Sequence, residues 1–172
     1  MTPRHGFAVV LLALAASAAS AQSVKTGVRA PEIDLPGLSG GRVKLSALRG
    51  HPVVVTFWQT WCPSCRSEFP ELIKVNALHG AAGLVVLGIN DPMQEHSSGD
   101  GAKHVKLFVN ELAVPFQIAL DKNGRTRDRF GILTLPTTIF IDSGGVVQAI
   151  NRGPTSRDEL ERGIGTILPK PE

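Results

Sequence analysis

The chain has 172 residues and a formal net charge of +3 at pH 7. This length suits one domain with one hydrophobic core, and the small positive excess argues against a nucleic-acid partner. The chain has only two cysteines, and no second cysteine pair is available to complete a zinc site.

Residues 1–21 have the pattern of a secretory signal peptide. Arg4 precedes an apolar stretch at 7–16, and small residues follow it up to Ala21. This order predicts cleavage before Gln22. The apolar stretch is shorter than the roughly 17–25 residues that a membrane-spanning helix needs, so an uncleaved membrane anchor is the less favoured alternative. We therefore expect a soluble protein in the periplasm or otherwise exported.

The sequence after the signal peptide alternates between strand-like and helix-like patterns. A flexible segment is expected at 22–32, a domain at 33–168 and a tail at 169–172. The expected elements are short strands at 33–35 and 43–45, a helical turn capped by Ser46, strands at 53–58 and 84–89, a helix at 64–79, a mobile polar loop at 91–101, a helix at 102–112, a strand at 116–120, a short helix at 125–130, a hairpin of strands at 137–141 and 146–150, and a helix from Ser156 to about Leu168.

The periodicity of apolar residues also predicts how these elements are arranged. The run at 53–58 is apolar almost throughout, which is typical of a strand in the middle of a sheet. Strands that alternate with helices favour parallel pairing, and the late hairpin adds antiparallel strands. The sequence therefore predicts an α/β fold with a central mixed sheet, helices on both faces and extra short strands at the N-terminus.

The cysteine pair follows directly on the central strand. A disulfide between Cys62 and Cys65 closes so small a loop that it constrains the unfolded chain little, so a redox role is favoured over a structural one. Cys62 is expected just before a helix, where unpaired N–H groups and the helix dipole lower the thiol pKa below its free value of about 8.5. Cys62 would then be the exposed nucleophile and Cys65 the resolving thiol. Pro63 suits the first helical turn.

Other uses of the pair fit this sequence less well, and we expect no metal and no cofactor. A c-type haem needs histidine after Cys65, where Arg66 stands. A Cu(I)-delivery protein is an alternative because thiolates suit that ion, although Met93 is the only methionine after the signal peptide. A peroxiredoxin needs Pro-x-x-x-Thr-x-x-Cys, and Val55 and Gln59 stand at the proline and threonine positions.

Residues 57–65 resemble the active-site stretch of thioredoxin-like proteins. The branch they resemble is the exported thiol–disulfide group that includes TlpA, ResA and the cytochrome c maturation thioredoxins. The resemblance covers most of 30–168 and implies a thioredoxin-like fold. The further segments that carry it are Glu68-Phe69-Pro70, Ala119-Leu120-Asp121, Leu135-Pro136-Thr137-Thr138, and Gly153 with Glu159-Leu160.

Glu68 is a candidate catalytic acid. It lies three residues after Cys65 on the same side of the predicted helix and matches a functional acid of the resembled branch. A carboxyl group in an apolar site has a raised pKa and can shuttle the proton that the exchange requires. The alternative is an exposed helix glutamate, because glutamate is rarely buried. General thioredoxins keep a buried aspartate in the preceding strand, and Thr56 occupies the matching position here.

Substrate contacts are expected from Trp61, Pro63, Leu135 and Pro136. The resemblance implies that Pro136 follows a cis peptide bond and leaves the Leu135 backbone free to pair with an extended substrate. A plain turn proline is the alternative, since few X–Pro bonds are cis. Trp58 is expected in the core, with Trp61 beside the sulfurs.

The resemblance implies an enzyme that reduces disulfides in exported proteins, with apocytochrome c or copper-oxidase assembly factors as clients. We expect a monomer. A membrane electron donor of the DsbD or CcdA kind would recharge it. A disulfide oxidase or isomerase with the same pair is the alternative. Ser64 departs from the branch, which commonly has proline before the second cysteine, so the direction of electron flow stays open.

Overall fold

The computed structural model describes residues 24–95 and 100–169. The predicted signal peptide and its cleavage site lie outside these ranges. In the described ranges, no helix is long and apolar enough to cross a membrane.

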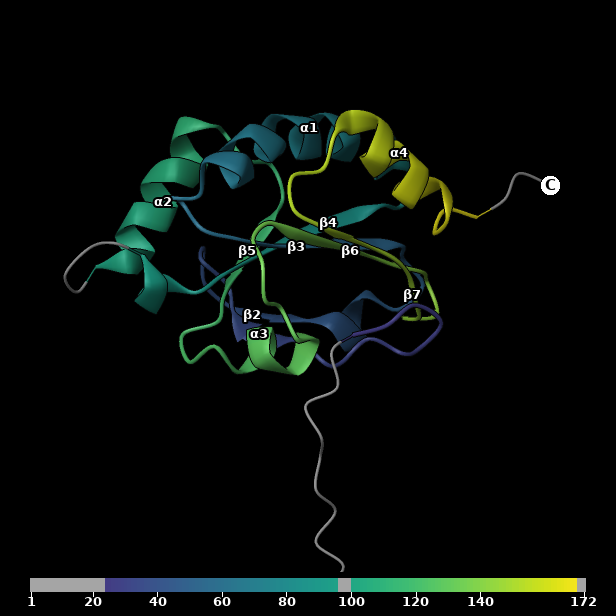
Figure 1. The fold of residues 1–172 in the computed structure, drawn as a ribbon, viewed down its shortest axis with the longest axis horizontal. Helices are drawn as coiled ribbons and strands as arrows, with labels where there is room; N and C mark the ends of the chain where they lie inside the picture. The colour runs from purple at the N-terminus through teal and green to yellow at the C-terminus, as the bar shows by residue number, and fades with distance from the viewer. Residues whose placement is uncertain (1–23, 96–99, 170–172) are drawn as a thin grey trace, which may run out of the picture.

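A five-stranded mixed sheet forms the centre of the fold (Figure 1). Its strand order is β5-β4-β3-β6-β7, with β3 in the middle and buried along its whole length, as the apolar run predicts. Strands β3, β4 and β5 pair in parallel, and β6 and β7 pair antiparallel. The strands are β3 (Val53–Trp58), β4 (Val85–Asn90), β5 (Gln117–Leu120), β6 (Thr137–Ile141) and β7 (Val147–Arg152).

Helices cover both faces of the sheet, which confirms the predicted architecture (Figure 1). One face packs against α1 (Pro63–His79), α2 (Gly101–Glu111) and α4 (Arg157–Gly165). The other face packs against α3, a two-stranded antiparallel sheet of β1 and β2, and the chain around them. These smaller elements are α3 (Arg125–Phe130), β1 (Asp34–Pro36), β2 (Arg42–Lys44), and the 3₁₀ helices η1 (Leu45–Leu48), η2 (Gly80–Ala82) and η3 (Pro92–Gln94).

Two short backbone contacts lie at the edges of the central sheet. At the β7 side, Arg29 forms an isolated antiparallel bridge with Val146, and the Gly27 N–H donates to the Val147 carbonyl. At the β5 edge, Gly37 forms a similar bridge with Ala119. Residues 24–32, where the sequence predicted a flexible segment, therefore make defined contacts with the body of the domain.

The element boundaries agree with the predicted ones to within two residues, apart from three local differences. Ser46 does not cap η1, which starts at Leu45, and its N–H donates to Glu32 instead. Residues 91–95 of the predicted mobile loop contain η3, whose cap is Asp91. The α4 helix has the predicted capping box of Ser156 and Glu159 but ends at residue 165.

Gly163 of α4 packs directly against the sheet. A Cβ at this position would lie 2.4 Å from the ring carbons of Phe140, a fully buried side chain. We expect Gly163→Ala to lower the free energy of unfolding by about 1–3 kcal/mol, because the overpacking outweighs the roughly 0.5–1 kcal/mol that alanine gains in a helix. Urea denaturation measures the change.

Gly165→Ala is the matched control, since nothing lies within 4 Å of a Cβ there. Its free energy of unfolding should stay equal to the wild type or rise slightly. Equal stabilities for the two alanine variants would contradict the packing argument.

Candidate active site

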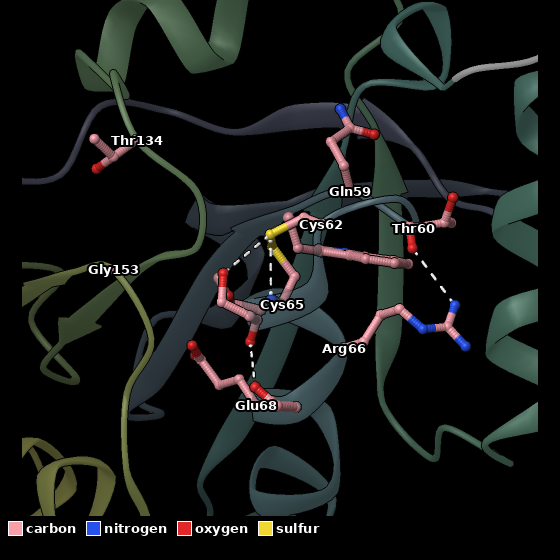
Figure 2. The surroundings of a disulfide bond; sticks show 12 residues. Gln59, Thr60, Cys62, Cys65, Arg66, Glu68, Thr134 and Gly153 are labelled. Atoms are coloured by element: carbon pink, nitrogen blue, oxygen red, sulfur yellow. Dashed lines mark hydrogen bonds between the residues drawn. A yellow bond between two sulfur atoms is a disulfide. The ribbon is translucent and has the colours of Figure 1, made fainter.

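Cys62 and Cys65 form a disulfide at the junction of β3 and α1 (Figure 2). Cys62 is the N-cap of α1 and Pro63 lies in the first turn, as predicted. The Cys62 sulfur accepts a hydrogen bond from the Cys65 N–H at 3.2 Å and lies 3.4 Å from the Ser64 hydroxyl. The same donors are placed to stabilise a thiolate at Cys62 when the disulfide opens.

The two cysteines are less accessible than the sequence suggested. Cys62 is 5% exposed and Cys65 is 1% exposed, so the expected exposed nucleophile is largely covered. Cys62 nevertheless remains the more accessible of the two residues. Trp58 is buried among Phe69 and Phe108, whereas Trp61, next to the pair, is 43% exposed. Trp58 thus lies in the core, as predicted, and Trp61 lies at the surface.

Glu68 is buried on α1, one helical turn beyond Cys65 (Figure 2). Its Oε1 is 2.6 Å from the Thr138 hydroxyl, and its Oε2 accepts the Thr155 N–H at 3.2 Å. The Thr138 hydroxyl is also bonded to the Thr56 hydroxyl at 3.2 Å. With 2% exposure, Glu68 is not the surface glutamate of the alternative interpretation.

Burial controls the ionisation of this carboxyl group. Desolvation raises the pKa of Glu68 from 4.5 to about 7, against the opposing effect of the hydrogen bonds from Thr138 and Thr155. The acid and the carboxylate are therefore both populated near neutral pH. A group with this property can accept and return a proton, as general acid–base catalysis requires.

The loop before β6 lies at the same end of the sheet as the cysteines, because Thr137 pairs with Phe57. The Leu135–Pro136 peptide bond is cis, and the Pro136 carbonyl accepts the Gly153 N–H at 2.8 Å. Among the described residues, neither backbone group of Leu135 has a hydrogen-bond partner. Figure 2 shows Thr134 and Gly153 on two loop segments that lie on the same side of the disulfide.

Sequence reasoning missed a buried polar cluster beside the disulfide. Gln59 directly follows β3, and Asn90 is the last residue of β4. Both residues are buried. The Asn90 amide nitrogen contacts the Trp58 carbonyl, the Gln59 side-chain oxygen and the Glu95 carboxylate. Because parallel strands end at the same edge of a sheet, the position of Gln59 and Asn90 at the two strand ends was a usable signal. Glu95, in an irregular segment, offered none.

Comparison with known proteins assigns the chain to a family. Residues 26–150 match the AhpC/TSA family. The chain belongs to this family. It is 33% identical over 139 residues to thioredoxin-like protein YneN of Bacillus subtilis, covering 81% of this chain and 78% of that protein. It is 29% identical over 147 residues to thiol-disulfide oxidoreductase ResA of Geobacillus kaustophilus, covering 86% and 80%.

A solved structure supports the same assignment. The crystal structure of a Chlorobium tepidum protein assigned as thiol:disulfide interchange protein DsbE matches with a TM-score of 0.73 and 31% identity, over 83% of this chain and 96% of that one. The resemblance to ResA-like proteins and the thioredoxin-like fold are thus confirmed. This member of the AhpC/TSA family is a thiol–disulfide oxidoreductase with a Cys62–Cys65 pair.

The raised pKa of Glu68 predicts a pH-dependent stability. Between pH 4.5 and 7 the folded protein holds the proton that the unfolded chain has released, so stability falls as pH rises through this window. The fall should approach about 3 kcal/mol. Glu68→Gln should remove it, and urea unfolding of the oxidised protein from pH 4 to 8 measures both profiles.

Glu71→Gln is the control on the same helix, because it keeps Glu68 and should keep the wild-type pH profile. Parallel profiles for the wild type and Glu68→Gln would show that Glu68 does not titrate in this range.

Proposed function

We propose that the protein reduces disulfides in exported proteins. The observation that supports this direction is the set of groups around the Cys62 sulfur. In the described part of the chain, its hydrogen bonds come from a backbone N–H and a hydroxyl, and none comes from a cationic side chain. A thiolate held by neutral donors is stabilised less than one paired with a cation, and a less stable reduced form makes the pair a stronger reductant.

The reaction in this proposal passes two electrons to the client. The Cys62 thiolate attacks one client sulfur, the client S–S bond breaks, and the released client thiolate takes a proton. The Cys65 thiol then gives its proton to the Glu68 carboxylate and attacks Cys62. The mixed disulfide breaks, the second client sulfur leaves and is protonated, and the Cys62–Cys65 disulfide forms.

The loop at Leu135 and Pro136 is the proposed binding site for the client backbone. An extended client strand would pair with the N–H and carbonyl of Leu135. Trp61 and Pro63 would contact client side chains next to the disulfide. The support is that Trp61 and Pro63 flank Cys62 in the chain and that Leu135 and Pro136 precede β6 at the same end of the sheet. Trp61 is partly exposed, and the Leu135 backbone has no hydrogen-bond partner within the described chain.

The proposed clients are apocytochrome c or copper-oxidase assembly factors, which the resemblance to the maturation thioredoxins implies. The proposed electron source is a membrane donor of the DsbD or CcdA kind, and the protein acts as a monomer after export. The named relatives support disulfide chemistry, and the choice of client rests on the resemblance.

The reduction potential of the Cys62–Cys65 pair tests the direction. We expect a value near that of thioredoxin, about −270 mV, from tryptophan fluorescence in defined thiol buffers. A value near that of DsbA, about −120 mV, would instead identify an oxidase and reverse the proposal. Trp61, next to Cys62, is the expected reporter.

Trapping identifies the clients. Cys65→Ser leaves the mixed disulfide unresolved, so cells that express this variant should accumulate covalent complexes with exported proteins. The double variant that also carries Cys62→Ser is the control and should accumulate none. Absence of thiol-sensitive complexes with Cys65→Ser, together with tight Cu(I) binding in equilibrium dialysis, would favour the copper-delivery alternative.

A further inference from the structure

Residues 91–95 hold the turn that leads into Cys62. The Glu95 carboxylate is only 6% exposed, although it lies just beyond η3. Its Oε1 accepts the Thr60 N–H at 3.0 Å and the Asn90 amide at 2.7 Å. Its Oε2 accepts the Thr60 hydroxyl. One buried carboxylate therefore binds both polar donors of a residue that stands two positions before the nucleophile.

The neighbours of Thr60 are bound to the same segment. The Gln59 amide donates to the Asp91 carbonyl at 3.0 Å, and the Trp61 indole N–H donates to the Gln94 carbonyl at 2.9 Å. Each of the residues 59–61 is thus bonded to 91–95 by its side chain. Figure 2 shows Gln59 and Thr60 on the stretch of chain that enters Cys62.

This turn also fixes the backbone of the nucleophile. The Cys62 N–H donates to the Gln59 carbonyl at 3.3 Å, which closes the turn directly before α1. On the outer side, the Arg66 guanidinium reaches the Thr60 carbonyl at 3.5 Å. Thr60 is therefore held from both sides, by Glu95 through its N–H and hydroxyl and by Arg66 through its carbonyl.

We propose that Glu95 is a positioning residue for thiol–disulfide exchange. Its carboxylate fixes the turn at Thr60 so that the Cys62 sulfur stays at the N-terminus of α1, aligned with the incoming or departing sulfur. Exchange requires three sulfurs nearly in line, and a misplacement of about 1 Å at a reacting group can cost on the order of 100-fold in rate. The proposal concerns the exchange itself and holds in either direction of electron flow.

Glutamine is a discriminating substitution at this position. In Glu95→Gln the amide oxygen can accept the Thr60 N–H and the Asn90 amide, and the amide nitrogen can donate to the Thr60 hydroxyl, which then acts as acceptor. Glu95→Ala removes all three bonds. A positioning role therefore predicts that glutamine restores what alanine loses, although it carries no charge.

The test measures exchange with small reagents on the mature protein. The reagents are dithiothreitol for the oxidised form and an aromatic disulfide for the reduced form. We expect Glu95→Ala to slow both reactions by about 10-fold or more and Glu95→Gln to stay within about 2-fold of wild type. Glu32→Ala is the matched control, because Glu32 also accepts a backbone N–H, from Ser46 at 3.0 Å, and lies away from the disulfide. Its rates should equal those of the wild type.

A second readout separates positioning from a general loss of stability. Hydrogen exchange of the Trp61 indole N–H, assigned by Trp61→Phe, should accelerate in Glu95→Ala while that of the buried Trp58 indole does not change. If Glu95→Ala does not fold, Thr60→Val supplies the test, since it removes the hydroxyl bond to Glu95 and should slow exchange in the same direction. Wild-type rates in the alanine variant, or equal losses with alanine and glutamine, would overturn the proposal.

Discussion

The central strand β3 pairs with β4 on one side and with β6 on the other, and this double pairing determines where α1 begins. The strand is apolar and buried on both faces, so it cannot slide without exposing hydrophobic side chains. Its last residue, Trp58, is locked among the rings of Phe69 and Phe108. The cysteine pair therefore sits on a rigid junction, although the residues between strand and helix form only a short turn.

The site combines two buried carboxyl groups with different surroundings. Desolvation raises the pKa of Glu68 toward neutrality despite the hydrogen bonds from Thr138 and Thr155. Glu95 accepts hydrogen bonds from the backbone and hydroxyl of Thr60 and from the Asn90 amide. The Glu68 carboxyl group is thus suited to proton transfer, and the Glu95 carboxylate binds the turn that precedes Cys62.

The sequence was sufficient where a local pattern determines the structure. The apolar run of β3, the N-cap position of Cys62 and the capping box of Ser156 and Glu159 are all local features, and they were predicted correctly. The burial of Glu68 was only one of two possibilities, because it depends on Thr138 and Thr155, which are 70 and 87 residues away in the chain. The cis bond before Pro136 followed from the resemblance, since local sequence favours trans.

Contacts that join distant segments of polar sequence could not be predicted. Residues 91–95 lack periodicity, which predicts a mobile loop, but their order depends on side-chain bonds to residues 59–61. Residues 24–32 also lack a pattern, and their order depends on backbone bonds to residues near Val147. Each of these bonds has a backbone group at one end or at both, and a backbone group leaves no signature in the side-chain sequence.

The bridges at Arg29 and Gly37 have a consequence for how an extended polypeptide can reach the central sheet. An uncovered strand edge is a template for any chain with free backbone groups, including a second copy of the protein or an unfolded client. Here the polypeptide that precedes β3 covers part of each margin, at Val146 on one side and Ala119 on the other. Pairing at the margins is thereby hindered. The backbone of Leu135, at the end of the sheet that carries the sulfurs, has no hydrogen-bond partner among the described residues and is open to the client strand proposed above.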